Sequence, residues 1–218
     1  MPQFASMPVD RLLRATHTLY TNARDDAEIA ADLVEFGYTG PDDYDEGLAL
    51  RSAVTDGLAT QSKEAADETL ANRAAQSATA QLRARFVRHR SAARRVHRTG
   101  TEGYTALRLA GPTPDARDLV LGSARHFYDT LAAHPDFYDR IRGLDAAGVT
   151  DAQALIADVD TTTAAQAKEK GEAERATFTL NEAIDALRAH SSELAYAAED
   201  ALADKPQLRE KLGLLEGS

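Results

Sequence analysis

The sequence predicts an all-α protein, an up-and-down four-helix bundle made of two similar helical hairpins with kinked short helices and two long helices. Three observations predict this fold. No segment alternates apolar and polar residues over the length of a strand. Alanine, the strongest helix former, makes up roughly a fifth of the chain, while glycine and proline gather in a few clusters. Short motifs also recur in the two halves at an offset of about 105 to 111 residues.

Two pairs of motifs carry the repeat. Phe36-Gly37-Tyr38-Thr39 precedes one long alanine-rich run, and Ala147-Gly148-Val149-Thr150 precedes the other. Further along come Gln61-Ser62-Lys63-Glu64 and Gln166-Ala167-Lys168-Glu169. Since this spacing is too long for a solenoid repeat, it indicates a duplicated half-domain.

The first half is predicted to hold two short helices and one long helix. Apolar residues at helical spacing predict the short helices over residues 9–22 and 26–36, after a loose N-terminal arm. Gly37 is placed to end the second helix. Thr39 is the expected N-cap of the long helix, with Pro41 in its first turn. A helix of this length needs other helices packed along it.

The second half repeats this order after a linker rich in glycine and proline. Leu119 and Leu131 mark a short helix that His134-Pro135 interrupts, and a second short helix is expected to run through Leu144 until Gly148 stops it.

A second long helix is then expected from Thr150 to about residue 203. Its apolar stripe from Leu180 to Ala198 follows the heptad spacing of packed helices. Pro206 should end it, and residues 207–215 should form a short terminal helix.

We therefore predict a single helical-bundle domain over residues 1–218. Its parts are the first hairpin repeat over 9–98, the linker over 99–114, the second repeat over 115–204, and a short C-terminal helix and tail over 205–218.

Composition restricts the function. The chain lacks cysteine, which excludes disulfides, thiolate metal sites and cysteine nucleophiles. The absence of a long apolar run and of cysteine predicts a cytoplasmic protein without membrane contact. The net charge of −10 makes nucleic acid an unfavourable partner. The acidity fits a salt-rich cytoplasm and equally an ordinary acidic bacterial protein.

No motif predicts a metal, a cofactor or a catalytic group. None of the six histidines has glutamate three residues before it, as a di-iron bundle requires. In the acidic run from Asp42 to Gly47, Tyr44 and Glu46 stand where a calcium loop needs Asp or Asn. Phosphate-binding glycine loops are also absent. We expect no catalytic, metal or cofactor-binding residues.

Two histidines and two tyrosines form a candidate pocket. His17 and His126 fall at roughly matching places in the two halves, and each is followed within three residues by a tyrosine, Tyr20 or Tyr128. The four could frame a pocket between the hairpins, or they could be half-buried groups satisfied by hydrogen bonds.

A basic segment is predicted to end the first long helix. It contains Arg83, Arg85, Arg88, Arg90, Arg94, Arg95 and Arg98, of which Arg83, Arg88, Arg94 and Arg95 are the candidate basic patch. Such a run can bind phosphates, or it can match the helix dipole and pair with carboxylates. The arginines surround the helix and few aromatic residues lie among them. This favours intramolecular contacts with acidic side chains.

The Phe36-Gly37-Tyr38-Thr39 motif and the tail from Lys205 to Leu214, KPQLREKLGL, resemble an uncharacterised family of bacterial all-helical proteins with duplicated hairpins and a PQLxEKLG-type C-terminus. The resemblance implies paired halves, each with a glycine-containing turn before a long helix, and implies no activity. In the second turn, Ala147 and Val149 replace the two aromatic residues of the first.

The sequence therefore favours a non-enzymatic interaction or scaffold protein, with a protein partner or self-association. A small-molecule-binding or enzymatic bundle with a pocket between the hairpins is the alternative. The third hypothesis is a nucleic-acid-associated protein that uses the basic end of the first long helix. A deep pocket with convergent polar groups would favour the second hypothesis over the first.

Overall fold

The computed structural model describes residues 4–214, and in this range it contains helices and turns but no β-strand, which confirms the all-α class. The elements are α1 (Val9–Asp25), α2 (Ala27–Leu33), the 3-10 turn η1 (Val34–Phe36), α3 (Pro41–Val96), α4 (Glu102–Ala106), α5 (Arg117–Ala133), α6 (Pro135–Tyr138), α7 (Ala146–Ala201) and α8 (Pro206–Lys211). Over the same residues, no helix combines the length and apolar character needed to cross a membrane.

The chain folds into two compact units that share the two long helices. Unit 1 contains the residues up to Ala65 and those from Glu172 onward, and unit 2 contains Ala66–Gly171. Each unit has its own apolar core, and each core takes one part of α3 and one part of α7. One four-helix bundle made of two hairpins is therefore not confirmed, although both predicted long helices are present.

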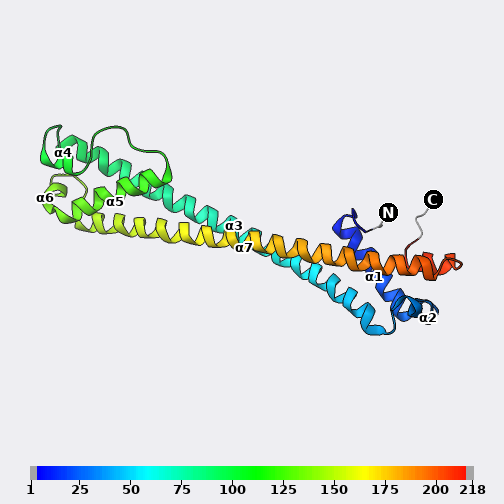
Figure 1. Cartoon of the computed structure of the whole chain (residues 1–218). Helices are drawn as coiled ribbons and strands as arrows, with labels where there is room; N and C mark the ends of the chain where they lie inside the picture. The colour runs from blue at the N-terminus through cyan, green and yellow to red at the C-terminus, as the bar shows by residue number, and fades with distance from the viewer. Residues whose placement is uncertain (1–3, 215–218) are drawn as a thin grey trace. The chain divides into compact units, whose positions relative to one another are not determined.

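Unit 1 packs α1, α2 and α8 against the first part of α3 and the last part of α7 (Figure 1). The predicted heptad stripe of α7 is buried, with Leu187, Leu194 and Ala198 fully inaccessible to solvent. Val54 of α3 belongs to the same core. Burying a leucine side chain contributes about 1.5–3 kcal/mol, so this stripe is a main source of stability in unit 1.

The N-terminal arm is not loose where the structure describes it. Phe4 is 2% exposed and Met7 is 6% exposed, and both belong to the core of unit 1. The backbone carbonyl of Met7 also accepts a hydrogen bond from Arg188 Nη2 at 3.0 Å. Two apolar residues are too few to show a helical periodicity, so the sequence did not predict that this segment packs on the core.

Gly37 makes the turn before α3. Its φ is +94°, which confirms the expected helix stop, because only glycine adopts this region without strain. The N-cap prediction at Thr39 is wrong, since α3 begins at Pro41. Asp43 Oδ2 instead accepts hydrogen bonds from the backbone N–H groups of Thr39 at 2.7 Å and Gly40 at 3.0 Å, the reciprocal half of a capping box.

Unit 2 packs α4, α5 and α6 against the last part of α3 and the first part of α7 (Figure 1). Phe86 of α3 and Phe127 of α5 meet edge to face at 5.6 Å between ring centroids, a favoured aromatic geometry. The expected break at His134-Pro135 is confirmed. The helix after this break is shorter than predicted: α6 ends at Tyr138, and Leu144 is buried but lies outside any helix.

The turn before α7 lies at Gly143, and the prediction that Gly148 stops a helix is wrong. Gly143 has φ +82°, whereas Gly148 lies inside α7. Asp145 Oδ1 accepts the backbone N–H of Gly148 at 2.8 Å and caps the helix start. Thr150 is likewise inside α7 rather than at its cap, and its hydroxyl donates to the carbonyl of Ala146 at 3.0 Å.

Within each unit, α3 and α7 run antiparallel. In unit 1, Gln61 Nε2 donates to Thr177 Oγ1 at 3.2 Å, and a Cβ atom added to Gly57 would lie 3.0 Å from Leu180. In unit 2, the matching pairs are Gln166 with Asn72 at 2.5 Å and Asp151 with Arg85 at 3.5 Å. In both pairs of contacts the residue number rises on one helix as it falls on the other.

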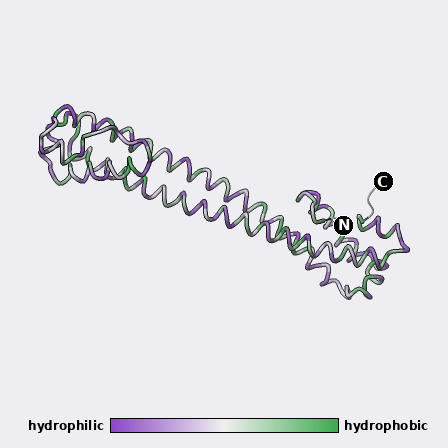
Figure 2. The backbone as a smooth tube through the Cα atoms, turned by 45° about the horizontal axis from the view of Figure 1, so that its top comes forward, coloured by the Kyte–Doolittle hydropathy of each residue, from purple (hydrophilic) through white to green (hydrophobic). Residues whose placement is uncertain are grey.

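The helices of the two units bury matching positions. Counted from the first residue, α1 and α5 bury the same five places: Leu12, Thr16, Leu19, Tyr20 and Ala23 in α1, and Val120, Ala124, Phe127, Tyr128 and Leu131 in α5. The 56-residue helices α3 and α7 also match at buried places, including Leu82 with Leu187, Phe86 with Ser191, Arg90 with Ala195, and Ala93 with Ala198. Hydrophilic and hydrophobic residues alternate along both long helices (Figure 2).

Candidate functional site

Tyr20 holds a hydrogen-bonded cluster in the core of unit 1. Its hydroxyl lies 2.7 Å from His190 Nδ1 and 2.9 Å from Ser191 Oγ. The Ser191 hydroxyl donates to the carbonyl of Leu187 at 2.6 Å, so Tyr20 donates to Ser191 and accepts from His190. Burial raises the pKa of Tyr20 far above its usual value, which keeps the phenol neutral.

Gly47 is necessary for this arrangement. A Cβ atom added to Gly47 would overlap the Tyr20 ring, so the missing side chain lets the ring lie against the backbone of α3. The cluster therefore joins α1, α3 and α7 through one side chain.

Tyr128 occupies the matching place in unit 2 but has one polar partner among residues 4–214. Its hydroxyl lies 3.0 Å from His89 Nδ1. Burial raises the pKa of Tyr128 far above its usual value. Burial also lowers the pKa of His89, and the positive charges of Arg88 and Arg85 lower it further. Both ring groups are thus held neutral near pH 7.

The structure places the four residues of the candidate pocket in different units and different environments. Tyr20 lies in unit 1 with His17, which is exposed and 3.4 Å from the Thr21 hydroxyl. Tyr128 lies in unit 2 with His126, whose Nε2–H donates to the carbonyl of Ala106 at 2.8 Å.

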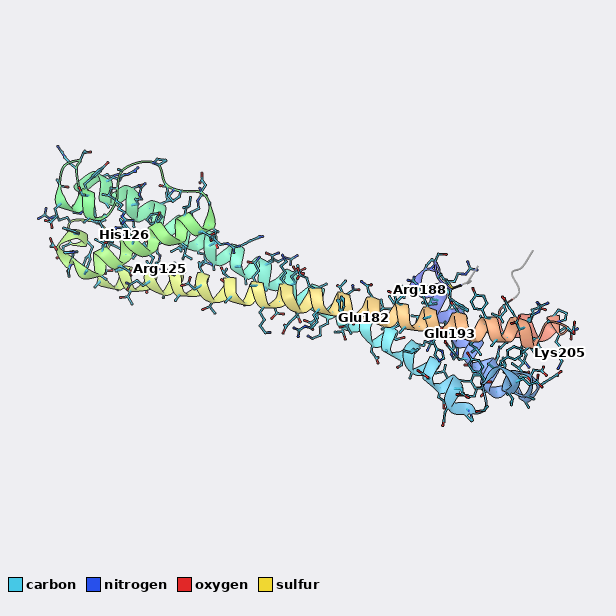
Figure 3. The ribbon with its side chains drawn as sticks, viewed as in Figure 1. Arg125, His126, Glu182, Arg188, Glu193 and Lys205 are labelled. Carbon is cyan, nitrogen blue, oxygen red and sulfur yellow. The ribbon has the colours of Figure 1, made fainter. Side chains whose placement is uncertain are left out.

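Each tyrosine pairs with a histidine of a long helix rather than with the nearby histidine. Counted along α1 and α5, His17 matches Arg125 rather than His126. Figure 3 labels Arg125 and His126, which are neighbours on α5. The sequence missed His190 and His89 because each lies on a different helix from its tyrosine, 170 and 39 residues away in the chain. The sequence did contain one indication of the cluster: Ser191 places a hydroxyl group in an otherwise apolar stripe, and a buried hydroxyl needs a hydrogen-bond partner.

The basic segment divides into fixed and free arginines. Arg83 pairs with Asp115, and Arg85 lies 3.5 Å from Asp151, so the expected carboxylate contacts occur at these two residues. Arg88 and Arg95 are exposed and pair with no carboxylate among residues 4–214. Only part of the candidate basic patch is therefore available to a partner.

Arg90 and Arg94 bind backbone carbonyls of the linker instead of carboxylates. Arg90 is 5% exposed, and its Nη2 lies 2.8–3.3 Å from four successive carbonyl oxygens, those of residues 108–111. Arg94 Nε donates to the Leu109 carbonyl at 2.7 Å. Burial lowers the pKa of Arg90, and Arg94 lowers it further. We call this pair the arginine clamp.

The clamp holds the chain where α4 ends in a Schellman motif. The N–H of Leu109 bonds to the Tyr104 carbonyl, and the N–H of Arg108 bonds to the Thr105 carbonyl, both at 3.1 Å. Arg108 takes the left-handed position that glycine usually occupies, with φ +48°. It is the one non-glycine residue with positive φ in the described part of the chain.

Two cavities lie beside these features. The linker cavity of unit 2 has a volume of about 280 Å³, and Phe86, Arg90, Arg108, Leu119, Ser123 and His126 are among its lining residues. The turn pocket of unit 1 has a volume of about 300 Å³ and is lined by residues that include Arg24, Val34, Tyr38, Pro41 and Tyr44.

The turn pocket has an aromatic wall. Tyr38 and Tyr44 stack with ring centroids 5.9 Å apart. The Tyr44 hydroxyl is buried and has no hydrogen-bond partner among residues 4–214. Val34 lines the pocket and is 49% exposed, and Phe36, two residues further along the chain, is 43% exposed. Large exposed apolar side chains next to a pocket are typical of an interaction surface.

The buried side chains of Tyr20, Ser191 and Arg90 bind one another or the backbone, and none of them joins a nucleophile to a base at a cavity. Ser191 and Tyr20 are buried in the core, and Arg90 is committed to carbonyls. The geometry instead provides a tightly held linker, one cavity with cationic walls and one apolar pocket. Comparisons with protein families, curated proteins and solved structures found no match to this chain.

Proposed function

We propose that this protein is a non-enzymatic interaction protein that self-associates. The acidic turn surface of one copy, defined by Val34, Glu35, Phe36 and Asp42, binds the basic helix end of a second copy. The observation that supports this is a pair of surfaces, each with exposed apolar side chains, that carry opposite unpaired charges.

The acidic turn surface belongs to the most negative part of the sequence. Between residues 24 and 46 the only cation is Arg24, and the carboxylates are Asp25, Asp26, Glu28, Asp32, Glu35, Asp42, Asp43, Asp45 and Glu46. Lys205 and Lys211 neutralise several of them, through Glu28, Asp32 and Asp26. Glu35 and Asp42 are exposed and form no ion pair with any residue from 4 to 214.

The basic helix end consists of Arg88, Arg95, Val96 and Arg98. Between residues 83 and 98 the sequence holds seven arginines and no carboxylate. Val96 is 41% exposed, and all three arginines of the basic helix end are exposed. An apolar contact surrounded by complementary charge gives specificity and fast association.

Two different surfaces would meet in this contact, so it is heterologous and can continue from copy to copy. Exposed ion pairs are screened over about 8–10 Å at physiological salt. We therefore expect association that strengthens at low salt and at higher protein concentration.

Sedimentation velocity of the full chain at low and high salt tests the proposal. Glu35→Lys with Asp42→Lys should abolish the association, and so should Arg88→Glu with Arg95→Glu. Mixing these two variants should restore heterologous pairs, because each retains one native surface. The control is Asp158→Lys, which changes an exposed carboxylate of α7 in unit 2 and should leave association unchanged.

A monomer at every salt and protein concentration would contradict self-association. The basic helix end could bind nucleic acid instead, and fluorescence anisotropy with labelled DNA detects this. In that case the logarithm of the binding constant would fall linearly with the logarithm of salt concentration. Arg88→Glu with Arg95→Glu would abolish that binding as well.

We also propose that the two halves of the chain arose by duplication. The same five buried places in α1 and α5, together with the matched places in α3 and α7, support this. The cytoplasmic location and the resemblance to a bacterial helical family stay predictions.

A further inference from the structure

We propose that the linker cavity of unit 2 binds a small organic carboxylate, with Arg108 contacting the carboxylate and the apolar wall enclosing the rest of the ligand. This site is separate from the surfaces proposed for self-association, and either proposal can fail without the other.

The first argument is an uncompensated buried charge. Arg90 is 5% exposed and lines the cavity, yet no carboxylate among residues 4–214 pairs with it. Its partners are carbonyl oxygens and the Thr113 hydroxyl, which lies 3.2 Å from Nη1. These groups provide dipoles but no negative charge. A cation held in such surroundings favours an anion nearby.

A second cation lines the same cavity. The Arg108 side chain is exposed, and it makes no ion pair with any residue from 4 to 214. A guanidinium can bind a carboxylate through two parallel hydrogen bonds. Arg90 thus supplies a fixed positive charge beside the cavity, and Arg108 supplies N–H groups that are free to donate hydrogen bonds to a ligand.

The backbone of Arg108 gives an independent argument. A glycine at this left-handed position would remove the steric strain that an arginine carries there. Strained backbone concentrates at ligand clamps and other functional sites. An arginine at this position destabilises the turn relative to a glycine. A binding role for its side chain at the cavity rim is the simplest explanation for the arginine.

The remaining wall selects the type of anion. Phe86 is a core residue, and Leu119 is 63% exposed although the sequence placed it on an apolar helix face. Ser123 adds a hydroxyl without a hydrogen-bond partner among residues 4–214, and His126 adds an imidazole held through Nε2. A wall of this kind suits a carboxylate with an apolar body better than bare phosphate.

The volume limits the ligand size. About 280 Å³ equals the share of roughly nine water molecules in the liquid. This favours a ligand of about that number of non-hydrogen atoms, such as a short aliphatic or simple aromatic acid.

Calorimetric titration of the full chain with hexanoate and benzoate tests the proposal. The matched neutral probes are hexanamide and benzamide, and inorganic phosphate is the third arm. We expect at least one acid to bind, its amide to bind at least tenfold more weakly, and phosphate to bind more weakly than the acid.

Three variants locate the site. Arg108→Gln should weaken acid binding at least tenfold, and the matched control Arg140→Gln, at an exposed arginine of unit 2 outside the cavity, should leave it unchanged. Arg108→Gly should weaken binding equally while raising the thermal unfolding midpoint, because glycine relieves the left-handed strain. A higher midpoint together with lost binding separates a ligand contact from damage to the fold.

Four results would overturn the proposal. These are equal binding of acid and amide, unchanged binding by Arg108→Gln, phosphate binding as tight as that of the acids, and no binding of either acid at millimolar concentration.

Discussion

The two units use the same helical positions to satisfy buried polar groups in different ways. At one matched place of the long helices, unit 1 has Ser191 and unit 2 has Phe86. Within residues 4–214, Tyr20 therefore has two polar partners, whereas Tyr128 has His89 alone.

One turn further along, the difference is reversed. Unit 1 has Ala195, and unit 2 has the buried Arg90, which binds the linker carbonyls. Similar helix packing thus accommodates a hydroxyl cluster in one unit and a buried cation in the other. The comparison shows that the polar residues can differ within a shared pattern of buried positions when those residues, here Ser191 and Arg90, find hydrogen-bond partners.

Truncating matched core leucines should give the largest effects. Leu82→Ala in unit 2 and Leu187→Ala in unit 1 remove side chains that are 1% and 0% exposed. Each should lower the free energy of unfolding by about 2–5 kcal/mol, because the lost burial adds to the cost of a cavity. Urea denaturation of each variant measures this. A loss below about 1 kcal/mol at either site would show that the matched places are not equivalent.

Removing the arginine clamp should cause the next largest loss of stability, and the loss should be confined to unit 2. Arg90→Met removes a donor from four linker carbonyls, one buried and three part-buried, at a cost of about 1–3 kcal/mol. Hydrogen exchange should also speed up in residues 107–113. Arg95→Met, at an exposed arginine of the same helix, is the control and should change stability by less than about 0.5 kcal/mol. Equal effects of the two variants would refute the clamp.

Removing one hydroxyl from each tyrosine should sharpen the comparison between the polar clusters. Tyr20→Phe should lower stability by about 1–2 kcal/mol, because Ser191 and His190 both lose a partner. Tyr128→Phe should cost about 0.5–1 kcal/mol, since His89 alone is affected. Thermal and chemical denaturation of both variants show which substitution lowers stability more. A larger loss for Tyr128→Phe would contradict the hydrogen-bond assignment in unit 1.

The smallest expected effect is a pH dependence from His89. Its pKa in the folded protein is lowered, so the unfolded chain binds the proton more readily. Stability should be complete above the unfolded pKa of about 6.5 and should decrease as the pH falls below it. Denaturation of the wild type and of His89→Gln between about pH 5 and 7.5 measures the difference. A stability difference between the two proteins that does not change with pH would exclude His89 as a source.

The sequence predicted the fold where one local rule decided the outcome. The stripe from Leu180 to Ala198 has a regular heptad spacing, and it is buried as expected. Gly37 ends its helix because the turn requires positive φ. Gly148 followed the same pattern but lies in a helix, since Asp145 caps that helix earlier and one glycine costs only about 1 kcal/mol.

The candidate sites were predicted less completely, for a different reason. Tyr20 and Tyr128 were identified, but their partners His190 and His89 come from distant parts of the chain, and no local spacing connects them. The expected carboxylate partners of Arg90 and Arg94 turned out to be carbonyls. Every residue has a carbonyl, so such a contact leaves no trace in composition or charge pattern.

The arginine clamp also changes how accessible the linker is to proteases. Residues 107–114 contain a glycine, two prolines and an arginine, and Arg108 is a chemically suitable site for trypsin. A protease must draw several residues into an extended strand, which here requires the carbonyls to leave Arg90 and Arg94. A segment with the composition of a labile loop is therefore expected to be cleaved slowly, and its rate of digestion reports how often the clamp opens.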